Sequence, residues 1–189
     1  DARSGADARG LMQLLPGTAS LVAKRNGLSW SGGDSLYDPS TNIVLGTRYL
    51  AKMAQRYSGA PWLASAAYNA GPNKVDQWLT ARGTLDPDLF VVSIPYKETR
   101  EYVARVMAFA VIYDWRLNGN ALAISTRMTR IGSPYSLPSP GAVRKQVSCP
   151  APAAAVAHAG RDTAPATPAV MQPAPAAASS SPASPDAQP

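Results

Sequence analysis

The sequence predicts an all-α domain followed by a disordered tail that is rich in Pro, Ala and Ser. Apolar side chains recur at helical spacing in segments bounded by Pro or Gly, and no segment alternates polar and apolar residues as a half-buried strand does. From about residue 133 this periodicity stops, and residues 150–189 contain nine of the 18 Pro and no aromatic residue. Such a composition buries too little apolar surface to offset the entropy lost on ordering. We therefore expect a folded domain over residues 1–132 and a disordered tail or linker over residues 133–189.

The first predicted helices lie between residues 16 and 59. Pro16-Gly17 interrupts the chain, and we expect Thr18 to cap a short helix that stops at Asn26-Gly27. Residues 28–37 are rich in Gly, Ser and Asp and are predicted to form a loop. Asp38-Pro39 combines an N-cap residue with a proline suited to the first helical position. The helix that follows is expected to end at Gly59 and to bury one face, formed by Ile43, Gly46, Leu50, Met53 and Tyr57.

The next segment contains two short helices. Pro61 opens a helix of small residues that ends near Asn69. Gly71-Pro72 then turns the chain into an amphipathic helix that stops at Arg82-Gly83, and Asp86-Pro87 leads into a short apolar stretch.

The longest helix is predicted over about residues 97–118, after Pro95 and before a stop at Gly119. Loop lengths of the usual size then allow five to seven helices in all. The long helix is expected to bury a face formed by Val103, Val106, Ala110, Tyr113 and Leu117.

The composition excludes several classes of protein. The single Cys, Cys149, rules out an intrachain disulfide, and the single His, His158, falls in the predicted tail. The domain can therefore hold neither a Ser-His-Asp triad nor a zinc site built from His and Cys. No apolar run is long enough to span a bilayer. Because the chain opens on Asp1 rather than Met, we interpret it as a fragment or a processed product.

The formal net charge of +6 favours polyanions such as nucleic acid, anionic membranes or acidic cell-wall polymers. The basic residues are scattered, however, and form no basic run or basic-aromatic stripe. We therefore do not expect nucleic acid to be a partner.

Three segments occur in an order and spacing that are typical of one protein family. They are residues 4–19 (SGADARGLMQLLPGTA), residues 67–72 (AYNAGP) and residues 94–103 (IPYKETREYV). Together they closely resemble the catalytic domain of soluble lytic murein transglycosylases, which are relatives of goose-type lysozyme. The resemblance extends from Asp1 to about Gly132 and excludes the tail.

The resemblance implies a lysozyme-like helical fold and the glycan strand of peptidoglycan as substrate. In this family one Glu protonates the glycosidic oxygen between N-acetylmuramic acid and N-acetylglucosamine. It then deprotonates a muramyl hydroxyl, which closes onto the anomeric carbon and leaves an anhydromuramyl end. One carboxyl group can serve as acid and base in turn, and the substrate's acetamido group can stabilise the cation. No metal or cofactor is implied.

Matching motif positions also implies which residues contact the substrate. Gln13 matches a substrate-contacting amide, and Tyr102 matches a tyrosine close to the acid and the acetamido oxygen. Ser4 matches a position whose hydroxyl hydrogen-bonds near the acid. The full set expected in the substrate-binding cleft is Ser4, Met12, Gln13, Tyr68, Asn69, Glu98 and Tyr102.

Most of these residues also have a purely structural interpretation. Ser4 fits a Ser-Gly turn, Met12 and Tyr102 fit a packed core, and Asn69 fits a helix C-cap. Glu98 fits a structural role in holding the Tyr68-Asn69 turn. Three residues outside the set are open to two interpretations as well. Arg100 fits either a surface ion pair or a contact with a substrate carboxylate. Trp62 and Trp78 fit either core packing or stacking on a sugar.

The catalytic Glu of the family stands in a Glu-Ser pair upstream of the Gly-Leu-Met-Gln motif, and that register runs off this chain before Asp1. We therefore expect a domain that lacks its first helix, no catalytic residue in residues 1–189, and little or no activity of the chain alone. Four carboxylates lie close by in the sequence, but none occupies the motif position: Asp1, Asp7, Glu98 and Glu101.

The predicted function is that of a lytic transglycosylase. The alternatives are a non-catalytic peptidoglycan-binding domain that keeps the groove without the acid, and a lysozyme-type hydrolase. The inferred substrate places the protein in the periplasm or cell envelope, with peptidoglycan glycan strands as its partner. We expect a monomer, and the sequence does not decide membrane association.

Overall fold

The computed structural model describes residues 2–136 and 138, and this part of the chain is helical, as predicted. The predicted tail, with Cys149 and His158, lies almost entirely outside the described residues. The only strand-like pairing among the described residues is two isolated antiparallel bridges. The helices are α1 (Pro16–Arg25), α2 (Pro39–Arg56), α3 (Pro61–Ala70), α4 (Pro72–Arg82), α5 (Pro87–Ser93) and α6 (Lys97–Asn118), with 3₁₀ turns η1 (Gly33–Tyr37) and η2 (Ile124–Arg127).

Proline marks the start of each helix from α1 to α5. Its fixed φ suits the first helical position, where its missing N–H costs nothing. The predicted cap at Thr18 is wrong: α1 begins at Pro16, so Thr18 lies inside its first turn. The cap at Asp38 is confirmed, since its carboxylate accepts a hydrogen bond from the Thr41 N–H at 2.7 Å.

Two segments are more ordered than the sequence patterns indicate. The predicted loop at residues 28–37 contains η1, and the apolar stretch after Asp86 is helix α5. The longest helix has the predicted bounds and ends at Gly119 in the left-handed conformation, with φ of +71°.

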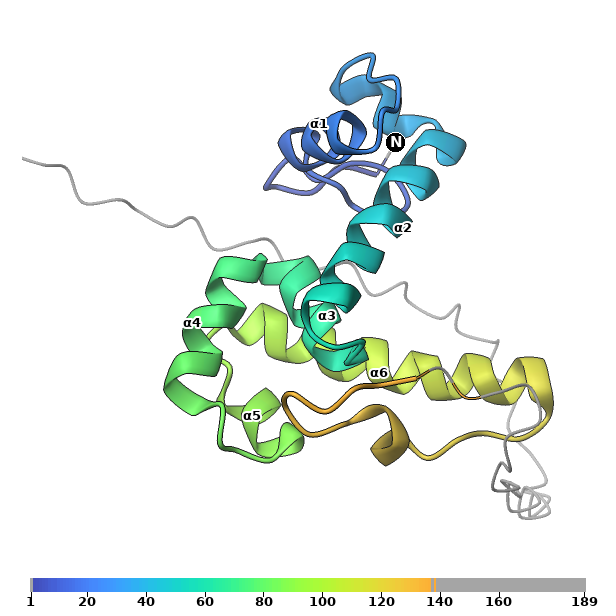
Figure 1. Cartoon of the computed structure of the whole chain (residues 1–189). Helices are drawn as coiled ribbons and strands as arrows, with labels where there is room; N and C mark the ends of the chain where they lie inside the picture. The colour runs from blue at the N-terminus through green and yellow to red at the C-terminus, as the bar shows by residue number, and fades with distance from the viewer. Residues whose placement is uncertain (1, 137, 139–189) are drawn as a thin grey trace, which may run out of the picture.

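The described helices form two lobes that are joined by α2 (Figure 1). The small lobe packs α1, η1 and the first half of α2 around Leu14, Val22, Leu36 and Leu45. The large lobe packs α3 to α6 and the second half of α2 around a core that contains Trp62. Tyr49, in the middle of α2, packs against both cores.

This arrangement explains why the predicted buried face of α2 is partly wrong. Gly46 and Met53 are buried, but Ile43 and Leu50 are exposed. The helix contacts α1 and η1 near its start and α3 near its end, so its buried side does not follow one stripe.

The predicted face of α6 is also partly wrong. Val103 is buried, whereas Tyr113 is 65% exposed and Leu117 is 82% exposed. The C-terminal half of α6 extends beyond α3 (Figure 1), and Tyr113 and Leu117 in this half stay exposed.

The segment after α6 is held against the large lobe by polar contacts. Asp114 forms a largely buried ion pair with Arg127 at 3.5 Å, and its Oδ2 accepts a hydrogen bond from the Leu122 N–H at 2.9 Å. The indole N–H of Trp62 donates to the Thr129 carbonyl at 3.0 Å. Both Trp62 and Trp78 are buried in the core, which supports the packing interpretation of these residues.

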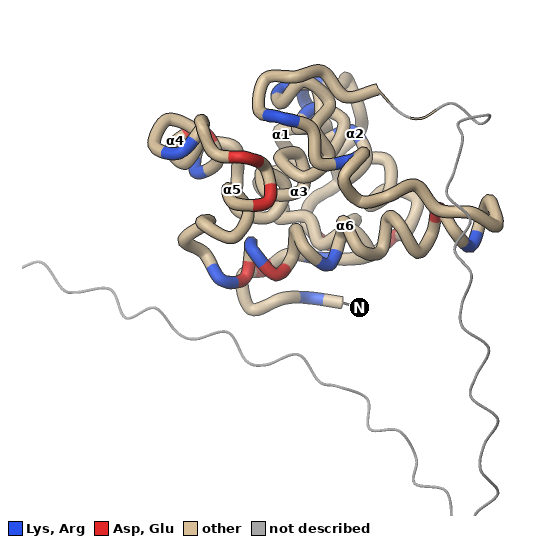
Figure 2. Tube along the Cα trace, turned by 90° about the horizontal axis from the view of Figure 1, so that it is seen from below, with Lys and Arg blue, Asp and Glu red and all other residues tan. Residues whose placement is uncertain are grey.

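Basic and acidic positions are interspersed along α4 and α6, whereas the charged residues of α1 and α2 are all basic (Figure 2). Among the described residues, no helix combines the length and the hydropathy that a membrane crossing requires.

Candidate functional site

A cleft of about 720 Å³ lies between the N-terminal segment, residues 4–15, and the facing ends of α3 and α6. One wall comes from the small lobe and the other from the large lobe, with Tyr49 of α2 between them. The structure brings all seven of the expected site residues to this cleft: Ser4, Met12, Gln13, Tyr68, Asn69, Glu98 and Tyr102.

The N-terminal wall is a compact double turn. Arg9 forms a bridge to Arg3 on one side and to Leu14 on the other. The Arg9 N–H donates to the Leu14 carbonyl at 2.9 Å, and the Leu14 N–H donates back at 3.1 Å. The turn between them contains Gly10 at φ of +72° and Gln13 at φ of +49°. This hairpin-like turn places the Met12 and Gln13 side chains at the cleft.

Asn42 of α2 holds this turn in place through its side-chain amide, although no sequence motif pointed to it. Its side chain is fully buried. The Oδ1 atom accepts a hydrogen bond from the Met12 N–H at 2.7 Å, and Nδ2 donates to the Arg9 and Leu36 carbonyls, each at 2.8 Å. Asn42 lies one helical turn before Gly46, on the predicted buried face of this helix. A polar residue on that face could have indicated its role, because a buried amide must have hydrogen-bond partners.

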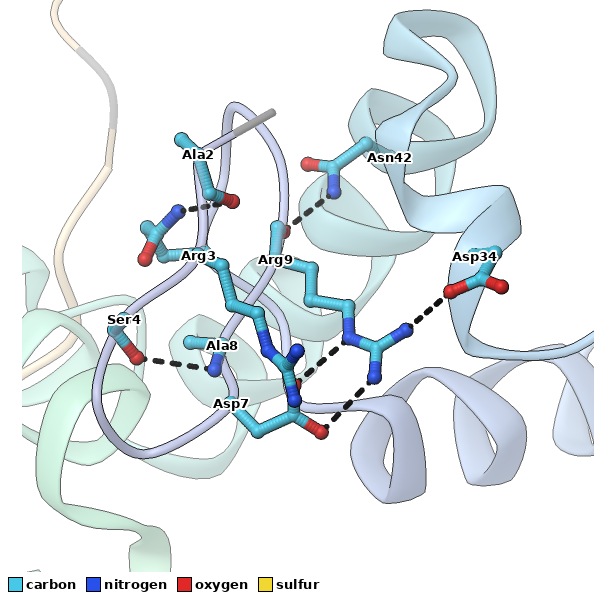
Figure 3. A network of polar contacts seen from close by, with 9 residues as sticks. Ala2, Arg3, Ser4, Asp7, Ala8, Arg9, Asp34 and Asn42 are labelled. Atoms are coloured by element: carbon cyan, nitrogen blue, oxygen red, sulfur yellow. Dashed lines mark hydrogen bonds and ion pairs between the residues drawn. The ribbon is translucent and has the colours of Figure 1, made fainter.

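A second network holds the outer side of the turn (Figure 3). The Asp7 carboxylate accepts hydrogen bonds from Arg3 Nε at 2.6 Å and from Arg9 Nε at 2.9 Å. Arg9 Nη1 also pairs with Asp34 of η1 at 2.7 Å. The hydrogen bond from Arg9, with that from Arg3, holds the pKa of Asp7 below its ordinary value. Asp7 is therefore an anion at neutral pH and does not suit the role of general acid.

Because the folded-state pKa of Asp7 is depressed, its stabilising effect is present above the ordinary aspartate pKa and is lost as pH falls through the folded value. We expect the unfolding free energy of the native protein to fall more steeply below about pH 4 than that of Asp7→Asn. Asparagine tolerates the positive φ of 65° at this position. Urea titrations from pH 6 to pH 3 would measure the two slopes. Asp88→Asn makes the same chemical change at an exposed aspartate outside the ion pairs of the described residues and is the matched control, so an equal change of slope in both variants would contradict the role given to Asp7.

Met12 and Tyr68 join the two walls. The Tyr68 hydroxyl, at the end of α3, donates to the Met12 carbonyl at 2.8 Å across the floor of the cleft. Burial raises the pKa of Tyr68, so the phenol stays protonated and remains a donor. The Met12 side chain lies over Gly46 of α2, where an added Cβ would come within 2.8 Å of the Met12 Cβ. Met12 is therefore packed against the helix and also lines the cleft.

Gln13 and Ser4 use part of their polar capacity within the turn. The Gln13 Nε2 donates to the Gly10 carbonyl at 2.8 Å, which leaves its Oε1 without a described donor. The Ser4 Oγ accepts from the Ala8 N–H at 3.0 Å, as the turn interpretation predicts. Both side chains are exposed at the cleft.

The opposite wall is held by a short chain of hydrogen bonds. The buried Thr99 hydroxyl donates to Asn69 Oδ1 at 2.6 Å, and Asn69 Nδ2 donates to Glu98 Oε1 at 3.1 Å. Glu98 thus contacts the turn at the end of α3, as the structural interpretation predicts. Tyr102 lies one turn further along α6, and partial burial raises the pKa of its phenol. The wall therefore presents an oriented amide and a neutral phenol.

Arg100 and Glu101 take no part in the cleft. Arg100 Nη1 donates to the Ile94 carbonyl at 2.5 Å, so it braces the start of α6 instead of pairing with a carboxylate. Glu101 is exposed and lies 3.8 Å from Lys97 on the surface of α6.

Comparison with known proteins shows which family the residues of this cleft resemble. Residues 1–91 match the family model described as "Transglycosylase SLT domain", and residues 93–121 match the one described as "Soluble lytic transglycosylase helical domain". Over these residues the chain is similar to soluble lytic transglycosylases. The expected resemblance is confirmed, and the lysozyme-like helical fold follows from it.

Three relatives show how much of the family the chain represents. The soluble lytic murein transglycosylase of Escherichia coli K12 is 43% identical over 115 residues, 60% of this chain and 18% of that protein. An inactive glutamate-to-glutamine mutant of lytic transglycosylase Slt from Pseudomonas aeruginosa is 47% identical, with a TM-score of 0.59, over 62% of this chain and 19% of that one. A 70-kDa soluble lytic transglycosylase in complex with bulgecin A is 37% identical, with a TM-score of 0.63, over 71% of this chain and 22% of that one. The chain thus spans about a fifth of the length of these relatives.

Proposed function

We propose that this chain forms the glycan-binding part of the active site of a lytic transglycosylase. Its reaction would cleave the bond between N-acetylmuramic acid and N-acetylglucosamine in peptidoglycan and leave an anhydromuramyl end. The convergence of the Gln13, Asn69 and Tyr102 segments on one cleft carries the proposal. Similarity to relatives that are named soluble lytic murein transglycosylases supports the substrate class.

The polar groups of the cleft suit an N-acetylated sugar. The free acceptor of Gln13 can receive the N–H of an acetamido group, and the phenol of Tyr102 can donate to its carbonyl. The apolar surfaces of Met12 and Tyr68 can pack against a sugar ring. We assign these residues to binding and orienting the strand so that the acetamido oxygen lies against the anomeric carbon and stabilises the cation.

We propose that the general acid is a glutamate upstream of Asp1, as the motif register predicts. Of the four candidate carboxylates, Asp1 lies outside the described residues and Asp7 is held as an anion by two arginines. Glu101 lies outside the cleft, and Glu98 is exposed and accepts a hydrogen bond from Asn69. The inactive glutamate-to-glutamine mutant of the Pseudomonas relative supports an essential glutamate. That residue would protonate the leaving oxygen and then accept the proton of the muramyl hydroxyl, so one group serves both steps.

Ligand binding tests the cleft directly. Bulgecin A, which the 70-kDa relative binds, should bind residues 1–189, and calorimetry should show affinity losses of about tenfold for Gln13→Ala and for Tyr102→Phe. Tyr113→Phe, at an exposed tyrosine outside the cleft, is the matched control and should bind as the native chain does. Unchanged affinity in both cleft variants would contradict the proposed site.

Product analysis tests the chemistry. Mass spectrometry of murein treated with residues 1–189 should find no anhydromuramyl product, whereas a chain extended by the upstream Glu-Ser segment should release it. Products with a reducing muramyl end, heavier by one water, would indicate a lysozyme-type hydrolase. If Gln or Ala stood at the upstream Glu position, the chain would be a peptidoglycan-binding domain. Release of anhydromuramyl product by residues 1–189 alone would overturn the assignment of the acid.

The proposed substrate also implies the surroundings of the protein. Peptidoglycan lies in the bacterial cell envelope, so we propose that the chain acts there as a monomer on glycan strands. Sedimentation of the purified chain would test the monomeric state.

A further inference from the structure

A second groove adjoins the cleft on the small lobe. It has a volume of about 740 Å³ and lies between α1 and the middle of α2. Thr18 and Tyr49 line both the cleft and this groove, so the two hollows meet at these residues. We refer to it below as the α1–α2 groove.

The walls of the α1–α2 groove carry three cations and no carboxylate. Arg25 is the last residue of α1, and Arg48 and Lys52 lie one turn apart on α2. None of the three takes part in an ion pair of the described residues; Arg48 Nη1 donates only to Asn26 Oδ1, at 3.3 Å. The α1 C-terminus accounts for a cation at Arg25 through the helix dipole, but it does not account for two more in the middle of α2. Three uncompensated cations around one hollow attract an anionic ligand.

We propose that the α1–α2 groove binds the carboxylates of the peptide stems that a murein strand carries, while its sugars occupy the adjoining cleft. This inference rests on the proposed function. Each muramyl residue bears its peptide on a lactyl group at the edge of the ring, so a strand in the cleft must project peptides along the neighbouring surface. The charged groups of these peptides include several carboxylates. Exposed Arg and Lys side chains are flexible and can form ion pairs with such carboxylates. A groove as large as the cleft itself has room for such a segment.

The test compares two ligands and two triple variants by calorimetry at low ionic strength. The ligands are short murein strands with their stem peptides and the same strands after an amidase has removed them. The groove variant combines three substitutions in one protein, Arg25→Gln, Arg48→Gln and Lys52→Gln. The control combines Lys74→Gln, Arg105→Gln and Arg116→Gln, which remove the same charge from exposed positions outside both hollows.

We expect the native chain to bind the peptide-bearing strand about tenfold more tightly than the bare strand. The groove variant should lose this preference and keep its affinity for the bare strand, whereas the control should keep the preference. Absence of the preference in the native chain, its survival in the groove variant, or its equal loss in both variants would overturn the inference. So would better competition by poly(glycerol phosphate) than by free stem peptide. Failure of the native chain to bind the bare strand would instead contradict the proposed function.

Discussion

Gly10→Ala is expected to destabilise the chain by about 3 kcal/mol and to abolish binding at the cleft. Gly10 has φ of +72°, which costs alanine about 1–2 kcal/mol. An added Cβ would also overlap the Leu36 carbonyl oxygen and Asn42 Nδ2, and forcing apart packed groups costs about 1–3 kcal/mol more. Because the carbonyl is backbone and Asn42 is buried, neither can move aside without shifting the turn that carries Gln13.

Urea unfolding and bulgecin A calorimetry would measure the two effects of Gly10→Ala. Gly27→Ala is the matched control, because Gly27 has a similar φ of +62° but open space around an added Cβ. It should show only the backbone cost of about 1–2 kcal/mol and keep its ligand affinity. Equal losses of stability in the two variants would show that the close approach to Asn42 contributes nothing.

Asn42→Ala is expected to cost a similar amount by a different route. Its loss would leave the Met12 N–H and the Leu36 carbonyl without the partners that the amide provides, at about 1–3 kcal/mol for each buried group. The Arg9 carbonyl would keep its bond from the Leu14 N–H. We therefore expect a total loss of about 3 kcal/mol, together with a weakened cleft at temperatures where the variant is still folded.

Asn42→Asp separates hydrogen bonding from shape. Aspartate has nearly the same size and keeps an acceptor for the Met12 N–H, but it offers no N–H to the two carbonyls. It should therefore fail to restore stability or ligand binding. Asn73→Ala, at an exposed asparagine on α4, should change neither quantity by more than about 0.5 kcal/mol. Native-like binding by Asn42→Asp would mean that the amide donors do not position the turn.

The residues around the cleft differ in how far the sequence predicts their roles. Motif matching placed Gln13, Asn69 and Tyr102 in one site, and the structure brings their segments together. Asn42 escaped notice because its role depends on carbonyls that are 33 and six residues away in the chain. Hydrophobic periodicity cannot identify a buried polar residue whose partners come from other elements.

The two helix faces show the same limit for packing. The spacing of apolar residues on α6 predicted burial of Val103 and Tyr113 alike, but only Val103 lies in the core of the large lobe, and Tyr113 is exposed. On α2, Met53 faces the large core, whereas Ile43 lies outside both cores. Periodicity identifies a helix, and it identifies the covered side only where one partner runs along the whole helix.

The sequence by itself determined the helical class and most helix boundaries, because prolines at the first position and glycines after the last act through local backbone geometry. Motif order also determined the family. Tertiary structure alone decided which side of α2 and α6 is covered, how Asn42 holds the Gly10 turn, and where the α1–α2 groove meets the cleft. These features depend on contacts between elements that are far apart in the sequence, and Tyr49 packs against both cores where the two lobes adjoin.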